Sequence, residues 1–212
     1  MNNESYRKLT LWLIAVWFVF ALSASAFHLF LTSPTTPPLP TGLAVLTPIL
    51  VFLAWFRISP GFRAFTLSLD SRLLTMVQCW RIAGFVFLVL YVYRILPGVF
   101  ALPAGWGDVV IGATAPFVAL KLASSSHRVA FITWQVLGMF DLVTAVGTAT
   151  TSRFLSTDQI STVPMTVLPL SLIPTFAVPL FFILHIICIA QARRWHESVH
   201  VRGGEPLPSS AA

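Results

Sequence analysis

Long apolar stretches separated by short polar segments dominate the pattern of this chain. A helix that crosses a membrane needs about 20 mostly apolar residues. Six stretches approach that length, at roughly 9–31, 41–57, 73–96, 103–121, 128–149 and 170–191. Polar and apolar residues do not alternate with a period of two, so a membrane β-barrel is not expected. The pattern predicts an all-α integral membrane protein, a six-helix transmembrane bundle.

The last stretch carries a repeated proline signal. Pro164, Pro169, Pro174 and Pro179 recur every five residues, and each proline removes a backbone donor and clashes with the preceding turn. The sequence therefore predicts a kinked last helix, with the kink near Pro174 and Pro179. Residues 1–192 form the predicted membrane domain, and residues 193–212 a flexible cytoplasmic tail.

Composition identifies the solvent of this chain as lipid. Hydrophobic residues make up 57% and charged residues 9%, whereas a soluble domain has about 25% charged residues. A net charge of +6 is typical of proteins that bind nucleic acid. Here, however, the charged residues lie in short loops between apolar stretches. The lipid bilayer is therefore the expected partner, nucleic acid is not, and the oligomeric state stays open.

Lysine and arginine are distributed unevenly between the two sides of the predicted bundle. With the N-terminus inside, the outer side has Arg94 and Arg153, and Arg81 lies within the membrane. The inner side has the other basic residues: Arg7, Lys8, Arg57, Arg63, Arg72, Lys121, Arg128, Arg193, Arg194 and Arg202. Because positive residues favour the cytoplasmic side, we expect a multi-pass protein of the plasma (bacterial inner) membrane with both termini cytoplasmic.

The first stretch has an alternative interpretation as a signal peptide. Arg7 and Lys8 precede an apolar core, and Ala24-Ser25-Ala26 resembles a cleavage site. The apolar stretch continues to Leu31, which is longer than a typical signal core of about 7–15 residues. An uncleaved helix is favoured, and cleavage would leave five helices in the same orientation.

Residues 57–72 also allow two interpretations. Phe62, Phe65, Leu69 and Leu73 fall near one helical face, which suits a short helix lying at the membrane interface. An inward extension of the third helix fits the same residues.

Arg81, Asp108, Asp141 and His185 fall deep inside the predicted helices. A helix rises about 1.5 Å per residue, which places Asp108 about 8 Å and Asp141 about 13 Å below the outer face. The same rise places Arg81 about 13 Å and His185 about 12 Å from the inner face, close to Gln78 and Gln135. The sequence thus predicts an outer acidic layer and an inner layer of Arg81 and His185.

Each acid shares a helix face with small residues, Gly105, Gly112 and Ala115 for Asp108, and Gly138 and Ala145 for Asp141. Small residues allow close helix packing, so both carboxylates are expected to face the interior. Arg81 is the natural cation for them, because arginine does not deprotonate. Together these polar residues predict a site that binds or transports a small polar solute or protons. The site comprises Gln78, Arg81, Asp108, Gln135, Asp141 and His185. Alternatively, the charges only fix the packing of a structural or partner subunit.

Gly105-Trp106-Gly107-Asp108 together with Asp141 resembles the paired motifs of intramembrane aspartyl proteases of the presenilin and prepilin-peptidase kind. That resemblance implies that Asp108 and Asp141 form a catalytic dyad that shares a proton and activates water. In the family the G-x-G-D aspartate comes second in the chain, and here it comes first. Enzymatic activity is therefore the second expectation, after binding or transport.

His196-Glu197-Ser198-Val199-His200 matches the H-E-x-x-H pattern, which on a helix presents two imidazoles to zinc. The motif lies in the charged tail, outside the predicted bundle, with Glu205 as the nearby third ligand. We therefore predict no metal or other cofactor. Cys79 and Cys188 lie in apolar stretches and are expected to pack as small core residues.

Overall fold

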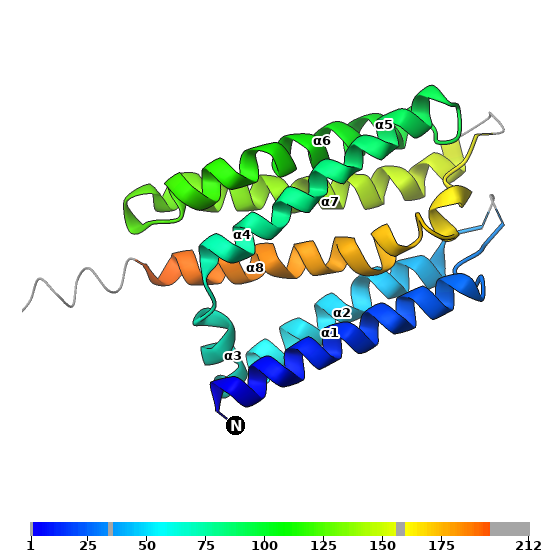
Figure 1. The fold of residues 1–212 in the computed structure, drawn as a ribbon. Coiled ribbons are helices and arrows are strands. Elements are labelled where there is room, and N and C mark those ends of the chain that lie inside the picture. The colour runs from blue at the N-terminus through cyan, green and yellow to red at the C-terminus, as the bar shows by residue number, and fades with distance from the viewer. Residues whose placement is uncertain (1, 34–35, 156–159, 196–212) are drawn as a thin grey trace, which may run out of the picture.

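The computed structural model describes residues 2–33, 36–155 and 160–195. These residues form helices and no strands, which confirms the all-α class. Six helical stretches are long and apolar enough to cross a membrane (Figure 1). They are Asn3–Ala26, Leu39–Ile58, Ser71–Val92, Gly98–Leu122, Ser125–Arg153 and Ile173–Arg194.

Several of these stretches are made of more than one helical element. In chain order the elements are α1 (Asn3–Ala26), α2 (Leu39–Ile58), α3 (Pro60–Leu67), α4 (Ser71–Val77), η1 (Gln78–Gly84), α5 (Phe85–Val92), α6 (Gly98–Phe117), η2 (Val118–Leu122), η3 (Ser125–His127), α7 (Arg128–Leu155), η4 (Val163–Thr166), η5 (Ile173–Ala177) and α8 (Val178–Arg194).

The first helix starts and ends earlier than the hydropathy pattern predicts. The side chain of Asn2 accepts a hydrogen bond from the amide of Ser5 at 2.8 Å and caps the helix. Glu4 lies in the first turn, where negative charge is favoured. The helix ends at Ala26, two residues before His28, whose φ of 56° is left-handed. Residues 29–31 are therefore not part of α1, although they are apolar.

The segment between the second and third spans is a separate helix. Ser59 caps α3 by accepting a hydrogen bond from the amide of Phe62, and Asp70 caps α4 through the amide of Arg72. Phe62 and Phe65 are buried against Tyr6 of α1. Of the two alternatives for this segment, an extension of the third helix is therefore wrong.

The helix α6 begins at Gly98, after Pro97, and not near residue 103. Pro103 lies inside this helix. At about 1.5 Å per residue, the ten residues from Gly98 place Asp108 roughly 15 Å from the start of α6. Asp108 is therefore deeper in the bundle than the sequence pattern indicates.

The last span departs from regular α-helix where the prolines predict a kink. Ile173–Ala177 form a π-helix that contains Pro174, and Pro179 follows in the first turn of α8. Arg193 and Arg194 belong to α8, so the predicted tail does not begin at 193. The rest of that tail, from residue 196, lies outside the described residues.

The arrangement in Figure 1 places α8 between α2 and α7, with which it makes contacts. On the far side of α7, α6 packs against η1 and α5. The indole of Trp17 ties α1 to this assembly by donating to the carbonyl oxygen of Thr175 at 3.2 Å. The start of α1 and the end of α8 lie at the same end of the molecule (Figure 1).

Candidate functional site

The middle of the third span is wound as a 3-10 helix, and this winding builds one side of the site. A 3-10 helix has about three residues per turn, so residues three apart lie above one another. Gln78, Arg81 and Gly84 of η1 are all buried, and Thr75 precedes them in the same register. The local winding therefore aligns three polar side chains and one glycine on a single face.

Arg81 lies at the centre of this face and binds two carboxylates. Its Nε donates to Oδ1 of Asp108 at 2.7 Å, and a terminal nitrogen donates to Oδ2 of Asp141. The other terminal nitrogen donates to the carbonyl oxygen of Gly138 at 3.1 Å. The side chain of Arg81 is fully buried, whereas both aspartate side chains keep 15% exposure.

A chain of neutral groups continues from the guanidinium toward α8 and back to α4. The same Arg81 nitrogen that contacts Gly138 lies 3.4 Å from Nε2 of His185. Arginine can only donate, so Nε2 accepts and the ring proton is on Nδ1. That proton is donated to Oε1 of Gln135, whose Nε2 donates to the hydroxyl of Thr75 at 3.1 Å. The imidazole is thereby held as one neutral tautomer.

We call Thr75, Arg81, Asp108, Gln135, Asp141 and His185 the Arg81 cluster. Its members come from α4, η1, α6, α7 and α8. Gln78 lies one 3-10 turn before Arg81, but its amide nitrogen donates to the carbonyl oxygen of Phe181 at 3.3 Å. Gln78 thus borders the Arg81 cluster without a hydrogen bond to it among the described residues.

The predicted separation into an acidic layer and a basic layer is wrong. Arg81 contacts Asp108 and Asp141 directly, and His185 touches the same guanidinium. Two features account for the difference. Because α6 starts early, Asp108 lies deeper in the bundle than predicted. The long side chain of Arg81 spans the remaining distance between its own backbone and the two carboxylates.

Glycines bring the backbones close enough for these contacts. A Cβ on Gly84 would lie 2.6 Å from Oδ2 of Asp108, and one on Gly107 would clash with the carboxylate of Asp141. Gly112 faces the backbone of Arg81, whose carbonyl carbon would lie 3.0 Å from a Cβ there. The glycines thus leave space for the charged side chains between the helices, and they also allow the helices to approach each other closely.

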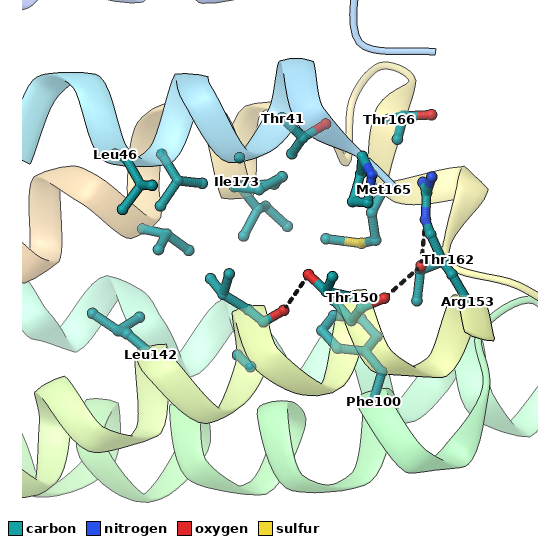
Figure 2. A pocket seen from close by; sticks show the side chains of 18 of the residues that line it. Thr41, Leu46, Phe100, Leu142, Thr150, Arg153, Thr162, Met165, Thr166 and Ile173 are labelled. Atoms are coloured by element: carbon teal, nitrogen blue, oxygen red, sulfur yellow. Dashed lines mark hydrogen bonds between the residues drawn. The ribbon is translucent and has the colours of Figure 1, made fainter. Parts of the chain in front are cut away.

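A cavity of about 300 Å³ adjoins the Arg81 cluster. It lies between α2 and α7 and is bounded by η4 and η5, and we call it the α2–α7 cavity. Asp108 lies in its wall, and Arg153 lies at the end shown on the right of Figure 2. Apolar side chains such as Leu46, Leu142 and Ile173 form most of the remaining wall. The cavity therefore connects a partly exposed carboxylate of the cluster with a second buried cation.

Arg153 is not the outer loop residue that the sequence pattern predicts. The helix α7 continues to Leu155, which leaves Arg153 within the helix and only 7% exposed. Its guanidinium donates to the hydroxyls of Thr162 and Thr32, at 3.2 and 2.7 Å. No periodic signal in the sequence marks this residue as buried, because both of its hydroxyl partners lie outside α7, Thr162 nine residues and Thr32 121 residues away in the sequence.

The arrangement of the two aspartates does not favour a protease dyad. A dyad shares one proton directly and holds a water between its carboxyl groups. Here Asp108 and Asp141 bind different nitrogens of one guanidinium, which lies between them. The H-E-x-x-H residues His196, Glu197 and His200, with Glu205, lie outside the described residues. Within residues 2–33, 36–155 and 160–195, no three potential ligands gather in a way that would hold a metal.

Comparison with known proteins gives one family. No curated protein and no solved structure matches the chain. One family pattern matches residues 38–193, from the start of α2 to the end of α8, and so includes every member of the Arg81 cluster. The chain therefore belongs to the family described as "Domain of unknown function (DUF8737)".

Proposed function

We propose that the chain crosses a membrane six times, with both ends on the cytoplasmic side. Large apolar side chains on the outside of the bundle support this placement, among them Trp12, Phe117 and Phe140, which are at least 61% exposed. A soluble protein rarely exposes so much contiguous apolar surface. The excess of lysine and arginine at the end that holds the start of α1 supports the orientation.

Within this placement, the Arg81 cluster is an intramembrane site that holds a proton and exchanges it when a small polar or cationic solute binds. One observation carries the proposal: two carboxylates share a single guanidinium, and one of them lies in the wall of a cavity. With both carboxylates ionised and His185 neutral, the cluster has one surplus negative charge. A surplus charge within a bilayer is costly, so a proton or a cation is expected to balance it.

The location of the two aspartates fits exchange of a proton for a solute better than permanent pairing of the carboxylates with Arg81. Each carboxylate retains partial exposure while the guanidinium between them has none. A ligand in the α2–α7 cavity could therefore reach Asp108 without displacing Arg81. Such a site would serve a proton-linked carrier or a binding protein for small polar solutes. The other candidate is a non-catalytic structural or partner subunit, in which the same charges only fix the packing.

Infrared spectroscopy tests the proton directly. The full chain is reconstituted in lipid vesicles at about pH 7, where an ordinary aspartate with a pKa of about 3.9 is ionised. The wild type is expected to show the C=O stretch of a protonated carboxylic acid. Both Asp108→Asn and Asp141→Asn are expected to lose that band, because Arg81 then neutralises the one remaining carboxylate. Glu4→Gln, which removes a carboxylate of the exposed Lys8 pair, serves as the control.

Absence of the band from the wild type would overturn the proposed proton site. Its persistence in both aspartate variants would do the same, because the proton would then belong to another group. The structural alternative makes a different prediction: no band in the wild type, and poor assembly of both asparagine variants.

A further inference from the structure

We propose that the α2–α7 cavity binds a single-chain anionic amphiphile, with its carboxylate at Arg153 and its hydrocarbon chain directed toward the middle of the bundle. The site uses Arg153 and Thr41, which are not members of the Arg81 cluster. The proposal rests on the membrane placement given above but not on a proton at Asp108.

The two ends of the cavity differ in chemistry. Figure 2 shows Arg153, Thr162 and Thr166 at one end, and Leu46 and Leu142 at the other. Val45, Leu142 and Val178 form a buried apolar cluster at that second end. Asp108 is the charged residue of the wall besides Arg153, and the side chains that line the cavity between them are mostly apolar. A ligand that fills the cavity from Arg153 inward must therefore combine a polar head with an apolar chain.

The head group is identified by the donors at the polar end. Arg153 has a permanent positive charge, and its described partners are the neutral oxygens of Thr32, Thr36 and Thr162. Thr41 also lines the cavity, and its hydroxyl oxygen is buried and has no hydrogen-bond partner within the described part of the chain. A cation and an available hydroxyl donor in the wall of one cavity favour a carboxylate, which has two acceptor oxygens.

The hydroxyls of Thr150, Thr162 and Thr166 complete the polar end without adding donors. They donate to the carbonyl oxygens of Val146, Ala149 and Val163, respectively. Their protons are therefore committed to the backbone. Donation to a bound carboxylate therefore falls to Arg153, and Thr41 is a further lining residue with an available hydroxyl.

The size of the cavity limits the ligand to one chain. Ligand pockets usually measure about 300–1,000 Å³, and this cavity, at about 300 Å³, is at the lower limit of that range. A phospholipid with two chains and a large head group would not fit inside it. A short fatty carboxylate would fit.

The direction of the site matches the direction of a lipid in the membrane. Arg153 is near the end of α7, and Leu39 to Leu46 belong to the first turns of α2, which starts at the same end of the molecule (Figure 1). The apolar end of the cavity lies deeper along both helices. A fatty carboxylate would thus enter with its head at the outer surface and its chain in the membrane interior.

Photolabelling tests this proposal with the full chain in lipid vesicles. The probes are dodecanoate with a photoreactive diazirine at the chain terminus and the matching dodecanol, which has the same chain and no charge. Dodecanoate is expected to label the peptides that line the apolar end, around Leu46, Leu142 and Val178. Dodecanol is expected to label them roughly tenfold less, since it has no charged head group to accept hydrogen bonds from Arg153.

Four variants locate the site. Arg153→Gln should reduce dodecanoate labelling roughly tenfold, and Arg94→Gln, which removes an exposed arginine away from the cavity, should leave it unchanged. Ala145→Phe should abolish labelling by filling the cavity while leaving Arg153 in place. Arg153→Lys retains the charge if the glutamine variant fails to assemble, and should retain most of the labelling.

Equal labelling by the two probes, or full labelling of either Arg153→Gln or Ala145→Phe, would overturn the proposal. Failure of the membrane placement is a separate result, because the chain would then be released from vesicles by alkaline washing before any probe is added.

Discussion

A Cβ atom added to Gly138 of α7 would lie 2.5 Å from Nε2 of His185 on α8. The same atom would lie 3.4 Å from the Arg81 nitrogen that contacts both residues. Gly138 is therefore in contact with the Arg81 cluster on two sides, and its carbonyl oxygen is itself an acceptor for Arg81. The absence of a side chain at this position allows His185 and Arg81 to meet.

Gly138→Ala is expected to lower the free energy of unfolding by about 1–3 kcal/mol, the usual cost of overpacking a filled interior. Unfolding in mixed detergent micelles measures this change. Gly147→Ala on the same helix is the matched control, because no atom lies within 4 Å of a Cβ there. The control should be neutral or stabilise the helix by up to about 1 kcal/mol. Equal effects of the two substitutions would show that contact with His185 does not matter.

Removal of the shared cation should be far more costly than removal of an exposed one. Arg81→Gln leaves two carboxylates without a positive partner, and breaking a buried ion pair in this way costs about 3–5 kcal/mol. The triple variant Arg81→Gln, Asp108→Asn and Asp141→Asn should recover much of that loss, because no charge remains. Melting temperatures of the purified variants measure both effects, with Arg94→Gln as the control.

Neutralising one aspartate and neutralising both should change the stability of the protein in opposite directions. Asp108→Asn or Asp141→Asn alone leaves one carboxylate for one guanidinium, so each variant should melt at or above the wild-type temperature, as expected for charges that are retained at some cost to stability. The double variant leaves Arg81 unpaired and should lose about 3–5 kcal/mol. This non-additivity reports coupling through Arg81. Poor assembly of both single variants would instead identify the acids as packing partners and remove support for the proposed site.

Cysteine labelling tests the orientation of the bundle. In a chain with Cys79→Ala and Cys188→Ala, Ser126→Cys lies between α6 and α7, and Tyr93→Cys lies after α5 at the opposite end. A membrane-impermeant maleimide added to intact cells should label Tyr93→Cys at once, and Ser126→Cys only after permeabilisation. The reverse pattern would invert the proposed topology, and immediate labelling of both would exclude it.

Hydropathy was sufficient to predict the six long apolar helices, because the length of each apolar stretch reflects local composition. The ends of those helices depend on features that hydropathy ignores. The Asn2 cap extends α1 toward the N-terminus, and Pro97 precedes an earlier start of α6. These signals are present in the sequence and could have been used.

The polar residues of the site were recognisable because charges are rare in membrane helices. Their mutual contacts were not predictable from depth alone, because depth contains no information on which helices are neighbours. The 3-10 winding of Gln78–Gly84 has only a weak signature, the spacing of Thr75, Gln78, Arg81 and Gly84. The burial of Arg153 depends on contacts with Thr32 and Thr162, which no local pattern reveals.

The 3-10 segment also sets the rotation of one half of the third span relative to the other. A 3-10 helix turns about 120° and rises about 2.0 Å per residue, against about 100° and 1.5 Å in an α-helix. Rewinding seven residues as α-helix would rotate α4 relative to α5 by roughly 140° and shorten the span by roughly 3.5 Å. Thr75 and Arg81 could not then keep their partners on α6, α7 and α8 together. The ion pairs of Arg81 with α6 and α7 thus depend on this local winding, which fixes the rotation of α4 relative to α5.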